Sequence, residues 1–475
     1  MSITVQSPVE GAVTITDDEL AGLRMRFRGA IVSPADDGYD DVRAVENLAV
    51  DRRPGLIIRC SGVADVIDGV NLARERGFTL AIRAGGHHIA GHGTTEGGLV
   101  IDLRDMDGVW VNPADKTVRV QGGATWGQVD RETQVHGLAV PGGIVSTTGV
   151  AGLTLGGGIG WLHRAYGLAC DNLLSARVVL ASGEVVTASD DENPDLFWAI
   201  RGGGGNFGVV VDFTFRAHPV GPEVALAAVF YEADAGRELM PQWRDLALRA
   251  GDRVTTRAMH WSMPAVDFLP PPVQGKDVFL FGAVYAGDKA EGQQIIDEFR
   301  SLGEPLFDMS EFLPDYRTFQ AGFDPLAKNL YGYWKSVYVD ELSDEVLAFI
   351  DEIGMSRPDP RTLVHVPIMG GATAAVPADA TAFGERDGGF MLSIDGATSD
   401  PEEFDRVKTW VREAYAAACA LPGAHGAYLN FSADDASATE VVRRQFGGNL
   451  DRLRAVKRAY DPANLFHVNG NITPA

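Results

Sequence analysis

Short apolar runs alternate with an amphipathic segment in the first quarter of the chain. The runs at 56–60, 80–86 and 99–106 have the length and composition of strands. Residues 64–77 repeat apolar side chains at helical spacing and stop at a glycine. This strand–helix–strand order predicts an α/β lobe.

Further strands and helices flank this unit. Residues 16–30 begin with Thr-Asp-Asp-Glu, a capping sequence that predicts a helix. Residues 117–123 predict a strand and 125–136 a helix, whereas 175–189 read as a hairpin with Ser-Gly at its turn. The apolar run 208–220 predicts a strand that closes this part of the chain.

Beyond residue 221 the pattern changes to strand-like runs interleaved with helix-like segments. Such a pattern is typical of an antiparallel sheet backed by helices, so it predicts a second lobe. A helix near 437–458 follows. The strand-like runs are 225–233, 277–287, 361–371 and 389–397, and the helix-like segments are 236–250, 289–303, 343–354 and 401–420.

Length, charge and cysteine content narrow the class of protein. A chain of 475 residues predicts two or three lobes. Its net charge of −24 repels nucleic acid and anionic membranes, so we expect neither as a partner. The N-terminus lacks a signal-peptide pattern and no apolar run reaches about 18 residues, which makes a cytoplasmic location the default expectation. Three cysteines without a CxxC pair argue against a disulfide framework or a zinc site.

Three glycine-rich clusters lie next to predicted strands, at 85–93, 142–160 and 202–208. Glycine allows backbone N–H groups to approach a pyrophosphate without a Cβ in the way. None of the clusters matches a phosphate loop or the GxGxxG of a Rossmann unit. The clusters suggest a site that binds a dinucleotide without a Rossmann fold. The alternative is that they form tight turns in a β-rich protein.

His87 lies inside the first cluster, directly after two glycines. A neutral imidazole nitrogen is a nucleophile and can also be a metal ligand. His88 and His92 are close by, but no nearby acidic or cysteine side chain completes a metal site, so no metal is expected. From the residues alone, a structural histidine is the favoured interpretation of His87 and a cofactor contact is the alternative.

Four segments carry a resemblance that decides between these interpretations. They are RAGGHH from Arg83, PGGIVSTTGVAGLTLGGGIGWLHRAYGLACDNLLSARVV from Pro141, NPDLFWAIRGGGGNFGVVVDFTF from Asn193 and YDPANLFHVNGNI from Tyr460. In this order they resemble the berberine-bridge-enzyme-like branch of the vanillyl-alcohol-oxidase flavoprotein superfamily. Residues 221–425 resemble the family mainly in layout.

The resemblance implies an α+β fold, with a two-subdomain FAD-binding lobe of the vanillyl-alcohol-oxidase (PCMH) type and a substrate lobe built on an antiparallel sheet backed by helices. The expected domains are 1–220 for FAD, 221–425 for substrate and 426–475 as a return to the FAD-binding lobe. By the family's motif, His87 bonds to the 8α-methyl group of FAD. The other residues expected to bind FAD are Arg83, Ala84, Gly85, Gly86, His88, Gly91, Pro141, Gly142, Gly143, Thr148, Gly149, Gly152, Gly157, Gly208, Val210, Asn469 and Asn471.

The number of covalent links follows from the register of the resemblance. Several family members carry a second link through a cysteine three residues before the position of Thr148, and here that position is Val145. Cys170 lies in a family motif but out of register, and a small buried thiol is its better interpretation. We therefore expect the histidyl link alone, as in the 6-hydroxy-D-nicotine oxidase type.

Candidate catalytic residues come from the substrate side. Tyr428 and Asn430 match a family strand whose tyrosine helps to deprotonate substrate hydroxyls, and a phenol needs a cationic neighbour for that role because its pKa is ordinarily near 10. Lys335 is the candidate neighbour. An acidic base found in some relatives is replaced by Ala375, and Glu385 is only a weak substitute. Trp261, Tyr331, Tyr333 and Trp334 supply aromatic side chains for a pocket or for the core.

Three functions remain open at this point. The first is an FAD-dependent oxidase that moves a hydride from a secondary-metabolite amine or alcohol to flavin N5, after which O2 is reduced to H2O2. The second is an oligosaccharide or sugar oxidase that forms a lactone, against which Val145 argues because such members usually have both links. The third is a flavin-carrying protein that binds or inactivates a drug. The chain is expected to be a monomer or a homodimer.

Overall fold

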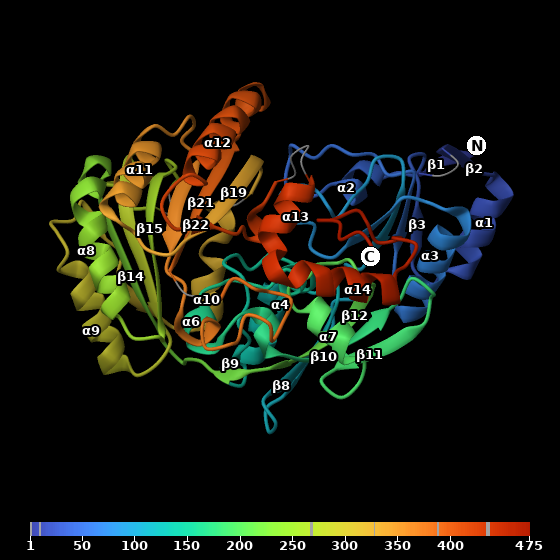
Figure 1. Cartoon of the computed structure of the whole chain (residues 1–475), viewed down its shortest axis with the longest axis horizontal. Helices are drawn as coiled ribbons and strands as arrows, with labels where there is room; N and C mark the ends of the chain where they lie inside the picture. Colours follow the sequence, from blue (N-terminus) through green and yellow to red (C-terminus); the bar gives the residue numbers. More distant parts are fainter. Residues whose placement is uncertain (1, 9–10, 267–268, 327, 387–388, 434–437) are drawn as a thin grey trace.

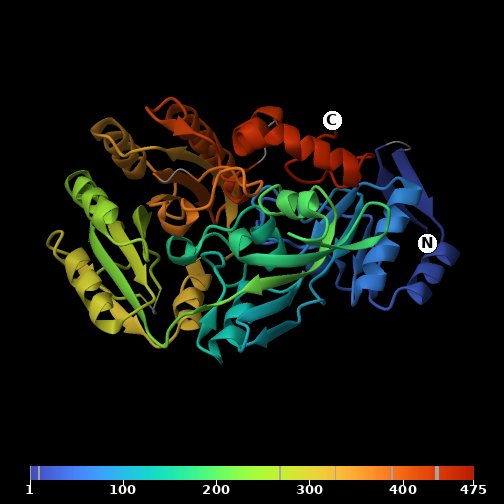
Figure 2. The same ribbon diagram turned by 60° about the horizontal axis from the view of Figure 1, so that its bottom comes forward.

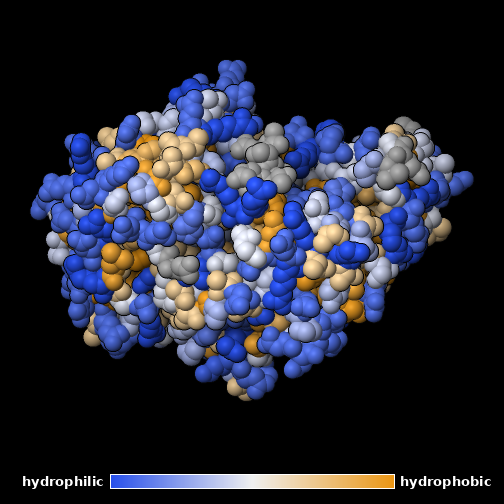
Figure 3. All heavy atoms as spheres, in the orientation of Figure 1, coloured by the Kyte–Doolittle hydropathy of each residue, from blue (hydrophilic) through white to orange (hydrophobic). Residues whose placement is uncertain are grey.

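The computed structural model describes residues 2–8, 11–266, 269–326, 328–386, 389–433 and 438–475. Two lobes lie side by side along the long axis, and both chain ends belong to the same lobe (Figure 1). No helix within the described residues is long and apolar enough to cross a membrane. The face shown in Figure 3 is mostly hydrophilic with scattered apolar patches.

The first subdomain is a four-stranded sheet in the order β3-β4-β6-β5. β4, β6 and β5 run parallel, as expected for strands joined through a crossover helix, and all but the last residue of β4 are buried. A two-stranded hairpin precedes it. The elements are β1 (Ile3–Ser7), β2 (Gly11–Ile15), α1 (Asp17–Arg26), β3 (Ala30–Val32), α2 (Tyr39–Arg43), β4 (Leu56–Arg59), α3 (Val63–Arg76), β5 (Leu80–Arg83) and β6 (Leu99–Asp102).

The second subdomain is an antiparallel sheet in the order β11-β10-β12-β8-β7, with short helices packed against it. Its core includes Trp126, Phe197 and Phe213. The elements are β7 (Val109–Asn112), β8 (Thr117–Gln121), α4 (Trp126–Gln134), β9 (Leu138–Ala139), α5 (Val150–Leu155), α6 (His163–Tyr166), β10 (Leu173–Val179), β11 (Val185–Ser189), α7 (Pro194–Ile200), β12 (Val209–Arg216) and β13 (His218–Pro219).

The other lobe is a nine-stranded antiparallel sheet in the order β17-β14-β16-β15-β20-β21-β19-β22, with β18 beside β14. Four helices, α8, α9, α11 and α12, cover one face of this sheet. Figure 2 shows the same lobe from a second direction. The strands are β14 (Val224–Glu232), β15 (Val254–Ser262), β16 (Asp277–Tyr285), β17 (Phe307–Asp308), β18 (Glu311–Leu313), β19 (Tyr331–Val339), β20 (Leu363–Pro367), β21 (Phe390–Thr398) and β22 (Ala424–His425), and the helices are α8 (Gly236–Arg249), α9 (Lys289–Arg300), α10 (Tyr316–Ala321), α11 (Asp344–Met355) and α12 (Phe404–Ala418).

The C-terminal segment packs on the first lobe. α13 (Ala438–Phe446) and α14 (Leu450–Tyr460) contribute Phe446, Leu453 and Val456 to the core around α7. The continuous helix predicted for 437–458 is wrong, because a 3₁₀ turn at Gly447–Asn449 divides it. Glycine is a poor helix former, and two stand in succession at this point.

The pattern of apolar and polar residues does not predict two central strands, β15 and β19. β15 and β19 are buried along most of their length and lie well inside the sheet order. Both carry polar side chains on buried positions, such as Arg257 and Lys335, so neither shows a clean alternation. The strand suggested by resemblance around Tyr428 is instead a 3₁₀ turn at Leu429–Phe431.

Candidate functional site

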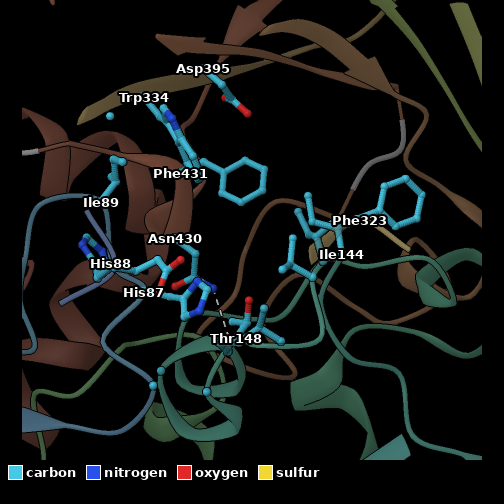
Figure 4. A pocket seen from close by; sticks show the side chains of 18 of the residues that line it. His87, His88, Ile89, Ile144, Thr148, Phe323, Trp334, Asp395, Asn430 and Phe431 are labelled. Carbon is cyan, nitrogen blue, oxygen red and sulfur yellow. Dashed lines mark hydrogen bonds between the residues drawn. The ribbon is translucent and has the colours of Figure 1, made fainter. Parts of the chain in front are cut away.

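A cavity of about 710 Å³ lies where the two lobes meet. One end is lined by glycine-rich loops of the first lobe, and the other by one face of the nine-stranded sheet. Figure 4 shows His87 and Thr148 on the first side, with Trp334, Asp395 and Phe431 across from them. One end of the cavity is therefore bordered by exposed backbone, and the other end is bordered by side chains.

The glycine-rich end leaves room that a side chain would take. Gly85 and Gly149 lie so close that a Cβ on either would overlap the backbone of the other. Gly152 and Gly205 also line the cavity, and a Cβ on either would meet nothing within 4 Å. Close backbone packing beside open space is the arrangement expected where main-chain groups border a phosphate-bearing ligand.

The ring of His87 points into this end of the cavity (Figure 4). Burial lowers the pKa of His87, while nearby Glu46 and Asp324 and a hydrogen bond to the Thr147 backbone oppose that shift. The imidazole is therefore neutral at physiological pH. Because the hydrogen bond to Thr147 raises the pKa, the ring N–H of His87 is its donor and the backbone carbonyl is its acceptor. In the neutral ring the other nitrogen then keeps its lone pair.

The C-terminal segment closes the same end. Asn469 lines the cavity, and its amide nitrogen donates to the carbonyls of Gly205 and Phe466. Its side-chain oxygen is buried without a hydrogen-bond partner among the described residues, as is that of Asn471. Buried polar atoms seldom stay unpaired, so such oxygens point to a missing donor.

Many of the residues expected from resemblance to bind FAD line the cavity. They are Ala84, Gly85, Gly86, His87, His88, Thr148, Gly149, Gly152, Gly208, Val210 and Asn469. They come from positions almost 400 residues apart, brought together by β5, α5, β12 and the C-terminal segment.

The remaining expected residues are not among those that line the cavity, so their contacts with FAD stay predictions. They are Arg83, Gly91, Pro141, Gly142, Gly143, Gly157 and Asn471. The Arg83 guanidinium donates to backbone carbonyls, including those of Val42 and Gly93. A Cβ at Gly142 would clash with the Trp126 ring, and a Cβ at Gly157 would clash with the Phe383 ring. These contacts show that Arg83, Gly142 and Gly157 shape the loops around the cavity.

The expected Tyr428–Lys335 pair is not formed. Tyr428 is buried away from the cavity, where its hydroxyl accepts hydrogen bonds from the backbone N–H groups of Gly158 and Ile159. Burial raises its pKa to about 12. Lys335 points to the opposite face of β19, with its Nζ donating to the Ala433 carbonyl and lying over the ring of Tyr333. Only Asn430 lines the cavity, and it donates to the Tyr428 hydroxyl.

Removing the Tyr428 hydroxyl should therefore affect stability and leave the rate of catalysis nearly unchanged. Tyr428→Phe leaves three donors without their acceptor, which costs about 1–3 kcal/mol of unfolding free energy. Denaturant unfolding measures this loss, and peroxide release measures turnover. A collapse of turnover at unchanged stability would restore the phenol as a catalytic group.

The other expected side chains divide between cavity and core. Trp261 and Trp334 line the cavity, whereas Tyr333 packs in the core under α12. Tyr331 lies near Phe404, and Glu385 pairs with His425. Sequence reasoning missed several cavity-lining residues, on the large sheet and on the loops facing it, because each belongs to an ordinary strand or loop pattern. They include Ile144, Trp161, Arg257, Met259, Phe323, Arg361, Asp395 and Phe431.

Comparison with known proteins places this geometry in a family. Residues 54–189 match the model of an FAD binding domain, and residues 427–473 match that of berberine and berberine-like proteins. An uncharacterized FAD-linked oxidoreductase of Bacillus subtilis, YgaK, is 30% identical over 461 residues, which cover 95% of this chain and 98% of the relative. The chain belongs to the berberine-bridge-enzyme-like family of FAD-linked oxidoreductases.

Other members of this berberine-bridge-enzyme-like family agree in sequence and fold. The (R)-6-hydroxynicotine oxidase of Paenarthrobacter nicotinovorans is 30% identical over 468 residues, covering 95% of this chain and 98% of the relative. The crystal structure of 6-hydroxy-D-nicotine oxidase from Arthrobacter nicotinovorans superposes with a TM-score of 0.81 at 26% identity, covering 94% and 98% of the two chains. A chitooligosaccharide oxidase superposes with a TM-score of 0.82 at 23% identity over 96% and 99% of the two chains, which shows the shared fold.

The residues of this cavity fit FAD. The open space beside Gly152 and Gly205 suits a pyrophosphate, and the unpaired Asn469 oxygen suits a ring or ribityl donor. His88 and His92 stack on each other at 4.0 Å. No cluster of three or more His, Cys, Asp or Glu side chains within the described ranges is arranged to hold a metal ion.

Proposed function

We propose that this protein is an FAD-dependent oxidase whose cofactor is joined to His87, and that it oxidises a small organic amine or alcohol with release of hydrogen peroxide. The observation that carries the proposal is the His87 ring, which is hydrogen-bonded to the Thr147 backbone, has its pKa lowered by burial and points into a glycine-lined cavity. Family membership supports FAD and oxidoreductase chemistry.

Bound FAD supplies a hydride acceptor and a route for the electrons to oxygen. His87 fixes the flavin end of the cavity because its ring is oriented by the Thr147 backbone. Ala84 to Gly86 and Thr148 to Gly152 would border the cofactor, and Asn469 would meet it from the C-terminal side. By holding the flavin ring in one position, these residues would let the substrate approach it in a fixed orientation, which lowers the entropic cost of the reaction.

The sheet-side wall selects and shields the substrate. Its apolar surface comes from side chains such as Met259, Phe323 and Phe431. A wall of this kind excludes water and binds flat or apolar molecules. A sugar substrate is disfavoured because oligosaccharide oxidases of this family usually carry both covalent links, and Val145 stands where the second link would be.

A single covalent link is expected, because Cys170 does not line the cavity proposed to hold the cofactor. Cys170 is completely buried, does not line the cavity, and has its thiol pKa raised by burial and by Asp171. A buried neutral thiol is a poor nucleophile. Cys170→Ser should therefore keep as much acid-stable flavin as the parent protein, as measured by absorbance of the acid-precipitated protein. Loss of the flavin from this variant would contradict the single link.

The oxidase activity is tested by a peroxide-release screen over aromatic amines, alcohols and oligosaccharides, with oxygen consumption recorded in parallel. We expect turnover of at least one aromatic or polycyclic compound and none of the sugars. Flavin bleaching under nitrogen, followed by recovery on readmission of air, identifies the electron acceptor. Reduction without recovery in air would contradict an oxidase.

A further inference from the structure

The large sheet presents alternate residues to the cavity, and one of them is a cation. On β15, Arg257, Met259 and Trp261 face inward, beside Leu280 and Gly282 of β16. Of the described strand residues that line the cavity, Arg257 alone carries a positive charge. Gly282 lies directly opposite Arg257 in the strand register, and its lack of a side chain leaves space beside the Arg257 side chain.

Arg257 is buried without a hydrogen-bond or ion-pair partner among the described residues. It is 4% exposed, and no described residue accepts a hydrogen bond from its guanidinium or lies within ion-pair distance. Asp395 is the acidic group whose charge reaches it, but Asp395 is on β21, with β20 between the strands, and it accepts from Ser393 and contacts His365. Burial lowers the Arg257 pKa only to about 10, so the side chain stays charged at neutral pH.

The other three buried arginines show how this chain ordinarily satisfies such a group. Arg386 makes two hydrogen bonds to the Asp171 carboxylate. Arg83 donates to backbone carbonyls, and Arg164 donates to the Met369 carbonyl and pairs with Asp252. A buried charge is costly unless it is paired, so an arginine left open toward a cavity points to a partner that arrives with the ligand.

The residues around Arg257 would place the ligand's anionic group near the end of the cavity that contains His87. Its guanidinium lies 4.1 Å above the ring of Trp161, whose indole N–H donates to the Ile144 carbonyl. Ile144 belongs to the loop that continues to Thr147 and Thr148. Trp161 also stacks on Phe323, 4.9 Å away between ring centroids. The cation is thus held flat against an aromatic wall next to the loop that orients His87.

We propose that Arg257 binds an oxyanion of the substrate, so that the substrate class is an aromatic or polycyclic acid. The planar guanidinium matches a carboxylate, which it can bind through two parallel hydrogen bonds. The apolar side chains that line the cavity, such as Met259 and Phe431, border the space for the flat body attached to it. An ionised phenol or enol offers the same charge at a single oxygen. This assignment rests on the proposed function, since it takes the anion to be part of the molecule that is oxidised.

The test measures binding of defined probes to the purified protein with its flavin. The probes are 2-naphthoate, its uncharged amide 2-naphthamide, and 4-nitrophenolate, with binding followed by calorimetry and by tryptophan fluorescence. The parent protein should bind 2-naphthoate at least about tenfold more tightly than the amide. Arg257→Gln should remove that preference, and Arg257→Lys should keep part of it because the charge remains while the fork is lost.

Two controls separate binding from folding. Arg253→Gln removes an exposed arginine just before β15 and should leave the preference intact. Thermal melting should show that 2-naphthoate stabilises the parent protein and not Arg257→Gln. Tighter binding of 4-nitrophenolate than of 2-naphthoate, still dependent on Arg257, would assign the oxyanion to an ionised hydroxyl and support the same site.

The proposal is overturned if the parent protein binds acid and amide equally, or if Arg257→Gln keeps the preference. It is also overturned if Arg257→Gln changes only the reduction potential of the flavin, because the cation would then serve the cofactor. The binding readouts do not depend on turnover or on a covalent flavin. Failure of the proposed function and failure of this assignment therefore give different results.

Discussion

Replacing His87 with alanine should abolish acid-stable flavin. The parent protein, precipitated in acid, should keep its yellow colour, and His87→Ala should lose it entirely, because the His87 ring is the nucleophile proposed to bond the flavin at that end of the cavity. The glycine loops and Asn469 remain, so the variant should still bind FAD reversibly. Absorbance of the washed precipitate measures the covalent fraction.

His88→Ala is the matched control for this variant. His88 also lines the cavity and lies next in the chain, but its Nδ1 accepts from the Ala90 N–H and its ring stacks on His92. It should retain acid-stable flavin. Equal loss from both variants would indicate that the loop as a whole, rather than the His87 ring, controls incorporation.

The second large effect is expected at Lys457, in the segment that closes the cavity from the C-terminal side. Lys457 is fully buried, and its Nζ pairs with Asp461 at 2.7 Å while donating to the carbonyls of Asn206 and Phe466. Asp461 in turn accepts from the N–H groups of Leu465 and Phe466. The pair fixes the loop at Asn206 and the turn before Asn469 in one arrangement.

Lys457→Met should therefore reduce the free energy of unfolding by about 3–5 kcal/mol, because it leaves the Asp461 carboxylate buried without its cation. It should also slow flavin incorporation. Denaturant unfolding of the flavin-loaded protein measures the first effect. Lys289→Met removes an exposed lysine paired with Glu223 and should cost no more than about 1 kcal/mol. Equal losses in the two variants would show that burial of the Lys457 pair is unimportant.

The sequence predicted local structure well where one physical signal dominated. The Thr16 capping box, the helix closed by Gly77 and the 175–189 hairpin all appear in the structure. The resemblance also indicated which loops would meet at the cavity, because motif positions such as Gly149 and Asn469 are defined by their neighbours in the chain. The direction that a glycine faces depends on its neighbours in space, so the sequence could not show that Gly142 packs on Trp126 and Gly157 on Phe383.

The sheet-side wall could not be predicted, because strand alternation determines it and the strands were only partly recognised. Lys335 and Trp334 are adjacent in sequence, yet they face opposite sides of β19. A shift of one residue in register would exchange them. Arg257 carries no motif, and only the sheet order shows that its nearest acidic group, Asp395, lies two strands away.

The most direct test of the central claim is peptide mapping of the acid-denatured protein. The account predicts that, after proteolysis, the peptide containing His87 carries the mass of FAD and that fragmentation places it on the His87 ring, with unmodified peptides around Val145 and Cys170. Flavin released free from the denatured chain, or found on any residue other than His87, would contradict it.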